Sequence, residues 1–260
     1  MDDRVAVTAE LEVWDRTVSA MRPQDRDDLG MATARIGTGL ALSVLRDPTG
    51  YWSKALGFTE PMTAGLVEEI IEFYRAAGSK RASLLLAPWV LPPDWADICA
   101  AYGLTPGGRA TKLVAPVDAV HLTGHTDLPI SKVEPGRLAD WGRVALSGFD
   151  MPDMLAPIID GLVNAKDFQH YAAWDGDRIA GGAVLAFVAG VGHLNTDATL
   201  PGYRNRGVQS ALITTRIRDA AEAGCAWVVA ETSDSGSSME NMLRAGLKPL
   251  YYSQNWVWQA

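Results

Sequence analysis

The chain has 260 residues, of which 48% are apolar and 21% charged, and it carries a formal net charge of -8 with a pI near 5.0. This composition is typical of a soluble globular protein with one large domain or two ordinary ones. The acidic balance argues against a broad basic surface for nucleic acid. No window approaches the ~20 apolar residues of a membrane span, and the start, MDDRVAVTAELEVW, does not read as a signal peptide. We therefore expect a cytoplasmic protein with neither nucleic acid nor membrane as a partner.

The chain has two cysteines, Cys99 and Cys225, each in or just after a predicted helix. Two distant cysteines form neither a disulfide framework nor a zinc cluster. We expect small buried thiols and no metal.

The first half contains a stretch, residues 65–114, that predicts helix, glycine, strand, helix, Gly-Leu and strand. Residues 216–258 give the same order, and AAYGLTPGG (100–108) is matched by LRAGLKPLY (243–251). This self-similarity indicates an internal duplication. A segment rich in Gly, Pro, Thr and Asp, residues 118–136, separates the copies. We therefore expect two domains, 1–125 and 126–260.

The second half begins with a short strand at ISKVE, and Pro135 follows where it can open a helix. A second helix is predicted at PDMLAPIIDGLVN. Residues 169–200 then read as three antiparallel strands, joined by an Asp-Gly turn signal and by a turn at Gly190. The later elements predicted are a helix after Gly207, a buried strand CAWVVAETS, a short helix SSMENMLRAG and a terminal strand KPLYYSQNWVWQ.

The segment LPGYRNRGVQSALI (200–213) joins the third of these strands to the helix. A helix N-terminus exposes about four unpaired N–H groups and roughly half a positive charge. Gly207 lets the backbone approach a ligand, while Arg204 and Arg206 add two cations. The turn therefore predicts a phosphate or pyrophosphate ligand, although neither a P-loop nor a dinucleotide fingerprint is present. The equivalent segment of the first half, residues 47–63, has no cluster of Arg and Gly, so we expect that half to be degenerate.

Residues 198–251, which carry this turn and the second copy of the repeat, resemble the GNAT superfamily of N-acetyltransferases. The hallmark of that family is Gln/Arg-x-x-Gly-x-Gly/Ala at a strand-to-helix turn that grips the pyrophosphate of acetyl-CoA. Arg204 and Gly207 match it, and Gln209 departs from it in the last position. The resemblance covers roughly residues 128–260. It implies an α/β fold of the α+β type: a mixed, mostly antiparallel central sheet flanked by helices, here duplicated, with acetyl-CoA as cosubstrate and no metal.

The resemblance also implies where acetyl-CoA binds. The strands at 193–200 and 226–232 would splay apart and admit the pantetheine arm between them. The implied contacts are the main chain of Thr199 and Leu200, the side chains of Arg204 and Arg206, the turn at Gly207, the N–H groups of Val208, Gln209 and Ser210, and the side chains of Ser238 and Asn241 near the sulfur.

Acetyl transfer to an amine requires the loss of a proton from the amine, because an amine with a pKa near ~10.4 is almost fully protonated at neutral pH. In the strand GHLNTDATL, alternation predicts four polar side chains on one face: His193, Asn195, Asp197 and Thr199. Histidine has the most suitable intrinsic pKa for a base, and the resemblance implies a base at the position of His193. Asp197 is the second candidate.

The proton donor for the departing thiolate is less clear, because Met242 occupies the position where many GNAT enzymes carry a tyrosine. A thiolate with a pKa near 8–9 is a fair leaving group, so the reaction can also proceed without a donor. The candidate substitutes are Tyr251 and Tyr252 from the last strand, and we expect Ser238 and Asn241 to hydrogen-bond the sulfur region of CoA.

We expect N-acetyl transfer to a small primary amine. A homodimer is compatible with this reaction. Asp150, Asp153 and Asp160 either attract a cationic acceptor or are solvated charges near helix ends. The nine tryptophans either line an acceptor pocket or pack in the cores. Two other functions stay open: a non-catalytic acyl-CoA-binding or sensor protein, and an acyltransferase with another acyl donor or acceptor.

Overall fold

The computed structural model describes residues 1–260, and the chain divides into two compact units. We call the unit made of Asp2–Leu11, Arg22–Thr111 and Tyr251–Ala260 the N-unit, and the unit made of Met1, Glu12–Met21 and Lys112–Leu250 the C-unit. Each unit takes residues from both sides of the predicted boundary at 125/126. The division into two GNAT-like halves at that boundary stays a prediction.

The N-unit has strands in the order β1-β2-β3-β4-β11-β5. The pairs β1–β2, β2–β3 and β4–β11 are antiparallel, and β3–β4 is parallel. Its strands are β1 (Met31–Ile36), β2 (Gly39–Val44), β3 (Lys54–Leu56), β4 (Arg81–Leu85), residues 105–111 of β5 (Thr105–Pro116) and residues 251–259 of β11 (Lys248–Gln259). Its helices are the start of α1 (Asp3–Ala20), α2 (Pro23–Asp28), α3 (Ala64–Ala77) and α4 (Trp95–Tyr102).

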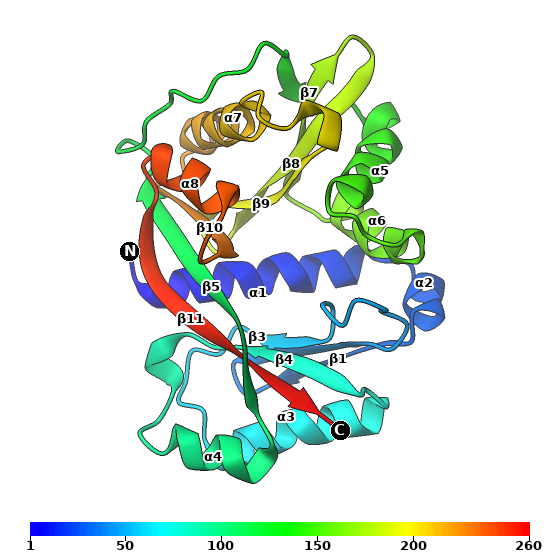
Figure 1. Ribbon diagram of the computed structural model, residues 1–260, viewed down its shortest axis with the longest axis vertical. Coiled ribbons are helices and arrows are strands. Elements are labelled where there is room, and N and C mark those ends of the chain that lie inside the picture. The colour runs from blue at the N-terminus through cyan, green and yellow to red at the C-terminus, as the bar shows by residue number, and fades with distance from the viewer. The chain divides into compact units, whose positions relative to one another are not determined.

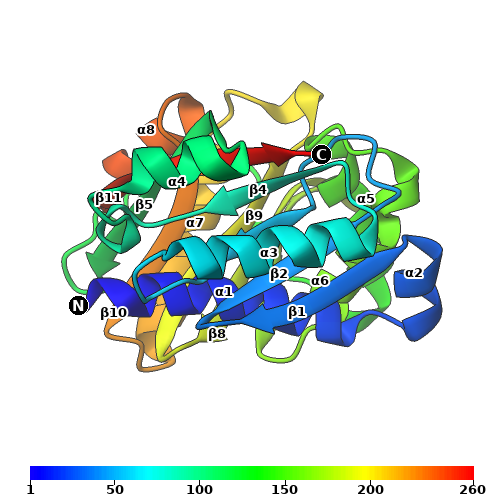
Figure 2. The same cartoon turned by 90° about the horizontal axis from the view of Figure 1, so that it is seen from below.

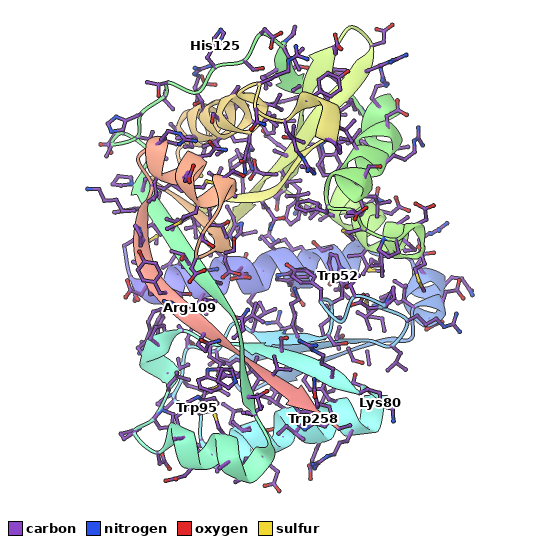
Figure 3. All side chains as sticks on the ribbon, in the orientation of Figure 1. Trp52, Lys80, Trp95, Arg109, His125 and Trp258 are labelled. Carbon is purple, nitrogen blue, oxygen red and sulfur yellow. The ribbon has the colours of Figure 1, made fainter.

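Helices α3 and α4 pack against the strands of the N-unit (Figure 2). The sequence defines α3 at both ends: the Thr63 side chain accepts a hydrogen bond from Leu66 N–H at 3.2 Å, and Gly78 ends the helix with a φ of 80°. Among the core rings, Trp95 lies edge-on to Trp256 and Tyr74 stacks on Trp258. Figure 3 labels Trp95 and Trp258. Because Thr63 already caps α3, the start of that helix differs from the arginine-flanked turn of the second half.

The C-unit has strands in the order β5-β10-β9-β8-β7-β6, antiparallel from β6 to β9 and parallel between β9 and β10. Its strands are residues 112–116 of β5, β6 (Ile130–Lys132), β7 (Phe168–Asp175), β8 (Arg178–Val188), β9 (Val191–Thr199), β10 (Trp227–Ser233) and residues 248–250 of β11. Its helices are the second part of α1, α5 (Leu138–Gly148), α6 (Ala156–Asn164), α7 (Val208–Glu222) and α8 (Ser237–Arg244).

Helices cover this sheet on both faces (Figure 1). One core joins alternate residues of the strands to α7 and α8, including Leu194 of β9 and Ala230 of β10. A second core, on the opposite face, joins β7 and β8 to α5 and α6 around the fully buried Trp141, whose indole N–H donates to Tyr171 O at 3.0 Å. Because successive side chains of a strand point to opposite faces, a strand residue next to a member of one core has its side chain on the face of the other core.

The structure confirms the mixed, mostly antiparallel sheet flanked by helices. It also confirms the three-stranded meander, the helix after Gly207 and the repeated order of helix, strand, helix and strand. The sequence reading did not include α1, α2 or strands β1 to β3. None of the helices is long and apolar enough to cross a membrane.

Candidate functional site

Strands β9 and β10 pair over only three residues each, Gly192–Leu194 and Val228–Ala230. Both strands continue beyond this ladder, to Thr199 and to Ser233, and there β9 pairs with β8 alone. The two strands therefore separate after Leu194 and Ala230. We call the opening between them the V, and we call the point where it begins, just after Leu194 and Ala230, its mouth. Its position agrees with the predicted splaying of strands 193–200 and 226–232.

A β-bulge in β9 lies at the mouth of the V. The register with β8 shifts between Gly182 and Val184, and Thr196 has a φ of 52°. A bulge inserts one extra residue, so side chains after it change face. Leu194 packs in the α7 core, and Asp197, three residues later, contacts Arg216 of α7. The prediction of one shared polar face is therefore wrong: Asp197 faces α7, while His193, next to Leu194 and before the bulge, faces away from it.

Asp197 forms an ion pair with Arg216, whose side chain is fully buried. The same guanidinium donates to Val184 O at 2.8 Å, Asn195 O at 3.1 Å and Leu212 O at 3.1 Å. Burial raises the pKa of Asp197, and the positive charge of Arg216 opposes that rise. The pair ties α7 to the bulge, which is a structural use of the carboxylate that was predicted as the second candidate base.

His193 lies in the short ladder itself, opposite Ala186 of β8 and Val229 of β10. Its side chain is 2% exposed. It therefore lies directly behind the mouth of the V, on the face opposite α7.

The predicted anion-binding turn precedes α7. Gly207 is the N-cap with a φ of 73° and no side-chain cap, and the helical ladder begins with Ala211 N–H donating to Gly207 O at 3.0 Å. The N–H groups of Val208, Gln209 and Ser210 therefore precede the first bond of the ladder. Arg204 Nε donates to Thr199 O at 3.4 Å.

Arg206 lies over the ring of Tyr203 and forms an ion pair with Asp127. This pair lowers the pKa of Asp127, chiefly through the hydrogen bond from Arg206. The carboxylate of Asp127 is thus paired with Arg206, one of the two arginines predicted to hold phosphate.

Side chains of α7 and α8 bridge the two helices beside the turn. Gln209 donates to Ser238 Oγ at 3.1 Å and accepts from the Asn241 amide, and Ser210 Oγ donates to Asn241 at 3.2 Å. Four residues predicted to contact acetyl-CoA are therefore brought together. Gln209, in place of the Gly or Ala of the hallmark, makes two of these three bonds across the gap.

The coil between β5 and β6, residues 117–129, contains His125 and lies along α7 (Figure 3). Gly124 N–H donates to Thr214 Oγ1 at 3.0 Å, and a Cβ atom on Gly124 would overlap Ser210 O. A Cβ atom on Gly207 would likewise overlap His125 O. This coil, which we call the linker, therefore makes close backbone contact with the predicted turn and with the first turns of α7.

The main-chain groups of Thr199 and Leu200 were predicted to bond pantetheine. Leu200 N–H donates to Ala180 O of β8 at 3.0 Å, and Leu200 O accepts from Tyr203 N–H at 2.9 Å. Because peptide groups alternate in direction along a strand, the main chain of Thr199 points the other way, toward the V. Thr199 is thus the better placed of the two.

The remaining predicted residues lie elsewhere. Met242 is buried in the α7 and α8 core, and Tyr251 is in the N-unit, edge-on to Trp89 at 4.8 Å. Tyr252 is also in the N-unit and 49% exposed. The three predicted acceptor-site aspartates are all exposed: Asp150, Asp153 and Asp160.

The structure adds two charged residues that the sequence reading missed. Lys112 Nζ of β5 lies 2.8 Å from Glu231 Oε2 of β10, with side chains that are 0% and 24% exposed. Glu231 directly follows Ala230, the last residue of the ladder. The signal in the sequence was a lone acidic residue at the end of the apolar run WVVA, but its partner lies in a strand more than a hundred residues earlier.

Residues 138–246 match the model of the family "Acetyltransferase (GNAT) family". No protein of curated function matches the chain. Among solved structures, the chain is similar to a GCN5-related N-acetyltransferase from Kribbella flavida, with 16% identity and a TM-score of 0.65 over 98% of this chain and 96% of that chain. It is also similar to a GCN5-related N-acetyltransferase from Sphaerobacter thermophilus, with 12% identity and a TM-score of 0.61 over 97% and 93%.

A third similar structure is a tandem GNAT protein from the clavulanic acid biosynthesis pathway, with 13% identity and a TM-score of 0.59 over 99% of this chain and 96% of that chain. At these identities the likeness shows the fold, whereas the family match rests on residues 138–246, which carry the V, the turn and both bridging helices. The chain therefore has a GNAT-like fold throughout, and residues 138–246 within it match the GNAT acetyltransferase family.

Proposed function

We propose that this protein transfers the acetyl group of acetyl-CoA to a primary amine of a small molecule by direct attack on the thioester. The observation that carries the proposal is the pairing of the V with the turn before α7 in one unit. The turn presents the first N–H groups of α7 and the positive end of the helix dipole, which favour phosphate. The V offers unpaired strand edges, which favour the amide groups of an extended pantetheine arm.

In this proposal, Val208, Gln209 and Ser210 meet the pyrophosphate through their N–H groups, and Gly207 gives it close approach to the backbone. Arg204 and Arg206 add charge, with Arg206 exchanging Asp127 for phosphate. Thr199 bonds pantetheine through its main chain, with Leu200 next to it in the chain. Ser238 and Asn241 lie on α8, across the gap from Gln209.

The amine must lose a proton as it attacks. His193 is our candidate base, because it lies directly behind the mouth of the V on the face opposite α7. Asp197 faces α7 and is held by Arg216, so we assign it to the support of the bulge. With Met242 buried, no tyrosine of α8 protonates the thiolate, and the low basicity of a thiolate makes such a donor dispensable.

A second function, non-catalytic binding of an acyl-CoA as in a sensor, is favoured by the bridge between Gln209 and α8 and by Met242. An acyltransferase with another donor or acceptor would use the same turn. The release of CoA thiol in the presence of amines distinguishes an enzyme from a sensor, and a comparison of acetyl-CoA with longer acyl-CoA esters tests the donor.

The decisive experiment is a calorimetric titration of acetyl-CoA into the wild type and into an Arg204→Ala/Arg206→Ala variant. We expect micromolar binding by the wild type and binding about tenfold weaker or more in the variant, because charge-assisted contacts to phosphate are lost. Arg178→Ala, at an exposed arginine of the β7–β8 hairpin, is the matched control. The absence of binding by the wild type would reject the proposal.

A further inference from the structure

The face of the C-unit sheet opposite α7 carries charged residues at the mouth of the V. Leu113 of β5 and Ala230 of β10 pack in the α7 core, so their neighbours Lys112 and Glu231 face away from α7. The contact between these two side chains agrees with that placement. His193, one residue before Leu194, lies on the same face. Three polar groups from three strands therefore share the face that α7 does not cover.

The ion pair between Lys112 and Glu231 is asymmetric. The lysine side chain is fully buried, whereas the carboxylate is 24% exposed. Burying a cation has a large desolvation cost, and replacing such a pair with apolar residues is often neutral or stabilising. A gain in folding stability therefore does not explain why this ion pair is present. Its effect is to hold an ionised carboxylate in a fixed position with one side toward solvent.

The position of that carboxylate relates to the proposed reaction. Glu231 follows the last residue of the β9–β10 ladder, so it lies where the strands begin to separate. A thioester in the V would have its carbon near this point, with the phosphates on the α7 side. Of the three polar groups on the face opposite α7, Glu231 is the one that reaches solvent, so a second substrate would meet this face at Glu231.

We propose that Glu231, positioned by Lys112, binds the ammonium group of a cationic primary amine at the mouth of the V. This inference rests on the proposed function and names the acceptor class. In the transfer, the amine nitrogen forms the C–N bond as the C–S bond breaks. The ammonium loses two protons: one is taken up by His193, and the other protonates the departing thiolate.

The test compares wild type, Glu231→Gln and Glu231→Asp by CoA thiol release with benzylamine, tyramine or spermidine as the charged acceptor and aniline as an acceptor that is neutral at pH 7. Glu222→Gln, at the exposed end of α7, is the matched control. We expect Glu231→Gln to raise KM for the charged amines about tenfold or more, with less change for aniline, because a charge-assisted hydrogen bond is lost. Glu231→Asp should recover part of the effect.

Lys112→Met keeps the length of the side chain and tests the positioning role. We expect it to raise KM for the charged amines with little change in kcat for aniline. Acetyl-CoA titration shows whether each variant retains the cosubstrate site.

Amine-dependent turnover that is unchanged in Glu231→Gln, with acetyl-CoA affinity intact, overturns this inference and leaves the proposed function standing. An equal loss for charged amines and aniline also overturns it, because the carboxylate would then not recognise charge. A wild type that binds no acetyl-CoA rejects both.

Discussion

Gly207 lies so close to His125 that a Cβ atom at position 207 would overlap the carbonyl oxygen of His125. The same glycine has a φ of 73°, a conformation that costs other residues roughly 1–2 kcal/mol. Two independent constraints therefore require glycine here: the direction of the backbone into α7 and the contact with the linker. Only the first is implied by the family hallmark.

Gly207→Ala should loosen the linker as well as strain the turn. We expect faster amide hydrogen exchange at His121 and Gly124, whose N–H groups bond Ala245 O and Thr214 Oγ1, because the linker must move to admit the methyl group. Gly202→Ala is the control, since a Cβ there meets no atom within 4 Å. Equal exchange in the two variants would contradict the contact. A larger residue at 207 would also displace the linker, so lost acetyl-CoA binding in such a variant would not isolate the turn.

Arg216→Met should be strongly destabilising, because it leaves the buried carboxylate of Asp197 without its cation. Breaking a buried pair from one side costs about 3–5 kcal/mol in unfolding free energy. Adding Asp197→Asn to the same chain should restore part of this loss, since the uncompensated charge is then gone. Urea denaturation of the two single variants and the double variant measures the coupling. Strictly additive losses would show that the two residues act independently.

His170 should make stability depend on pH. Burial lowers its pKa from 6.5 to about 4. Between these values the unfolded chain binds a proton that the native state excludes, so this contribution is present above pH 6.5 and is lost as the pH falls toward 4. We expect a loss of about 2 kcal/mol between pH 7 and pH 5 from this residue. Urea denaturation should show a smaller pH dependence in His170→Gln and an unchanged one in His121→Gln, an exposed control.

Gln209→Ala should strengthen acetyl-CoA binding several-fold. The Gln209 side chain makes two hydrogen bonds to α8 that compete with a ligand between the helices, and a neutral hydrogen bond contributes about 1 kcal/mol. Ser238→Ala removes only one of these bonds and should have a smaller effect. Isothermal titration measures both. Weaker binding in Gln209→Ala would instead mean that the amide contacts the cosubstrate directly.

His193→Ala should lower kcat at least about tenfold, since general base catalysis contributes roughly 10²–10⁴ to the rate. Acetyl-CoA affinity should change little, because His193 lies on the face opposite α7. The pH–rate profile should lose the ionisation of the base. A profile identical to that of the wild type would remove His193 from the mechanism.

The features that were predictable from the sequence are local ones. The start of α7 follows from a glycine preceded by two arginines, and the meander follows from alternation and turn residues, because both signals lie within a few neighbouring positions. The bulge at Thr196 left only a weak signal: three consecutive polar residues, Asn195–Asp197, interrupt the alternation of GHLNTDATL, and only the pairing with β8 shows that one residue is extra. The predicted shared face of His193 and Asp197 failed for that reason.

The ion pair of Lys112 and Glu231 could not be predicted from neighbouring residues in the sequence, for a different reason. It depends on the order of strands in the sheet, which places the end of β5 next to β10. Periodicity identifies strands but does not determine which strands become neighbours when their sequence separation is large. The linker contact at Gly207 is unpredictable in the same way.

The final part of β5, together with residues 12–21 of α1, belongs to the C-unit, although both precede the segment 118–136 that separates the two copies of the repeat. Cutting the gene at that segment would therefore give a fragment, 126–260, that lacks the neighbour of β10 and the lysine that holds Glu231. An unpaired strand edge of that kind promotes aggregation. We expect two separately expressed pieces to become functional only after they reassociate. The chain should therefore fold as one unit, despite its repeated order of helices and strands.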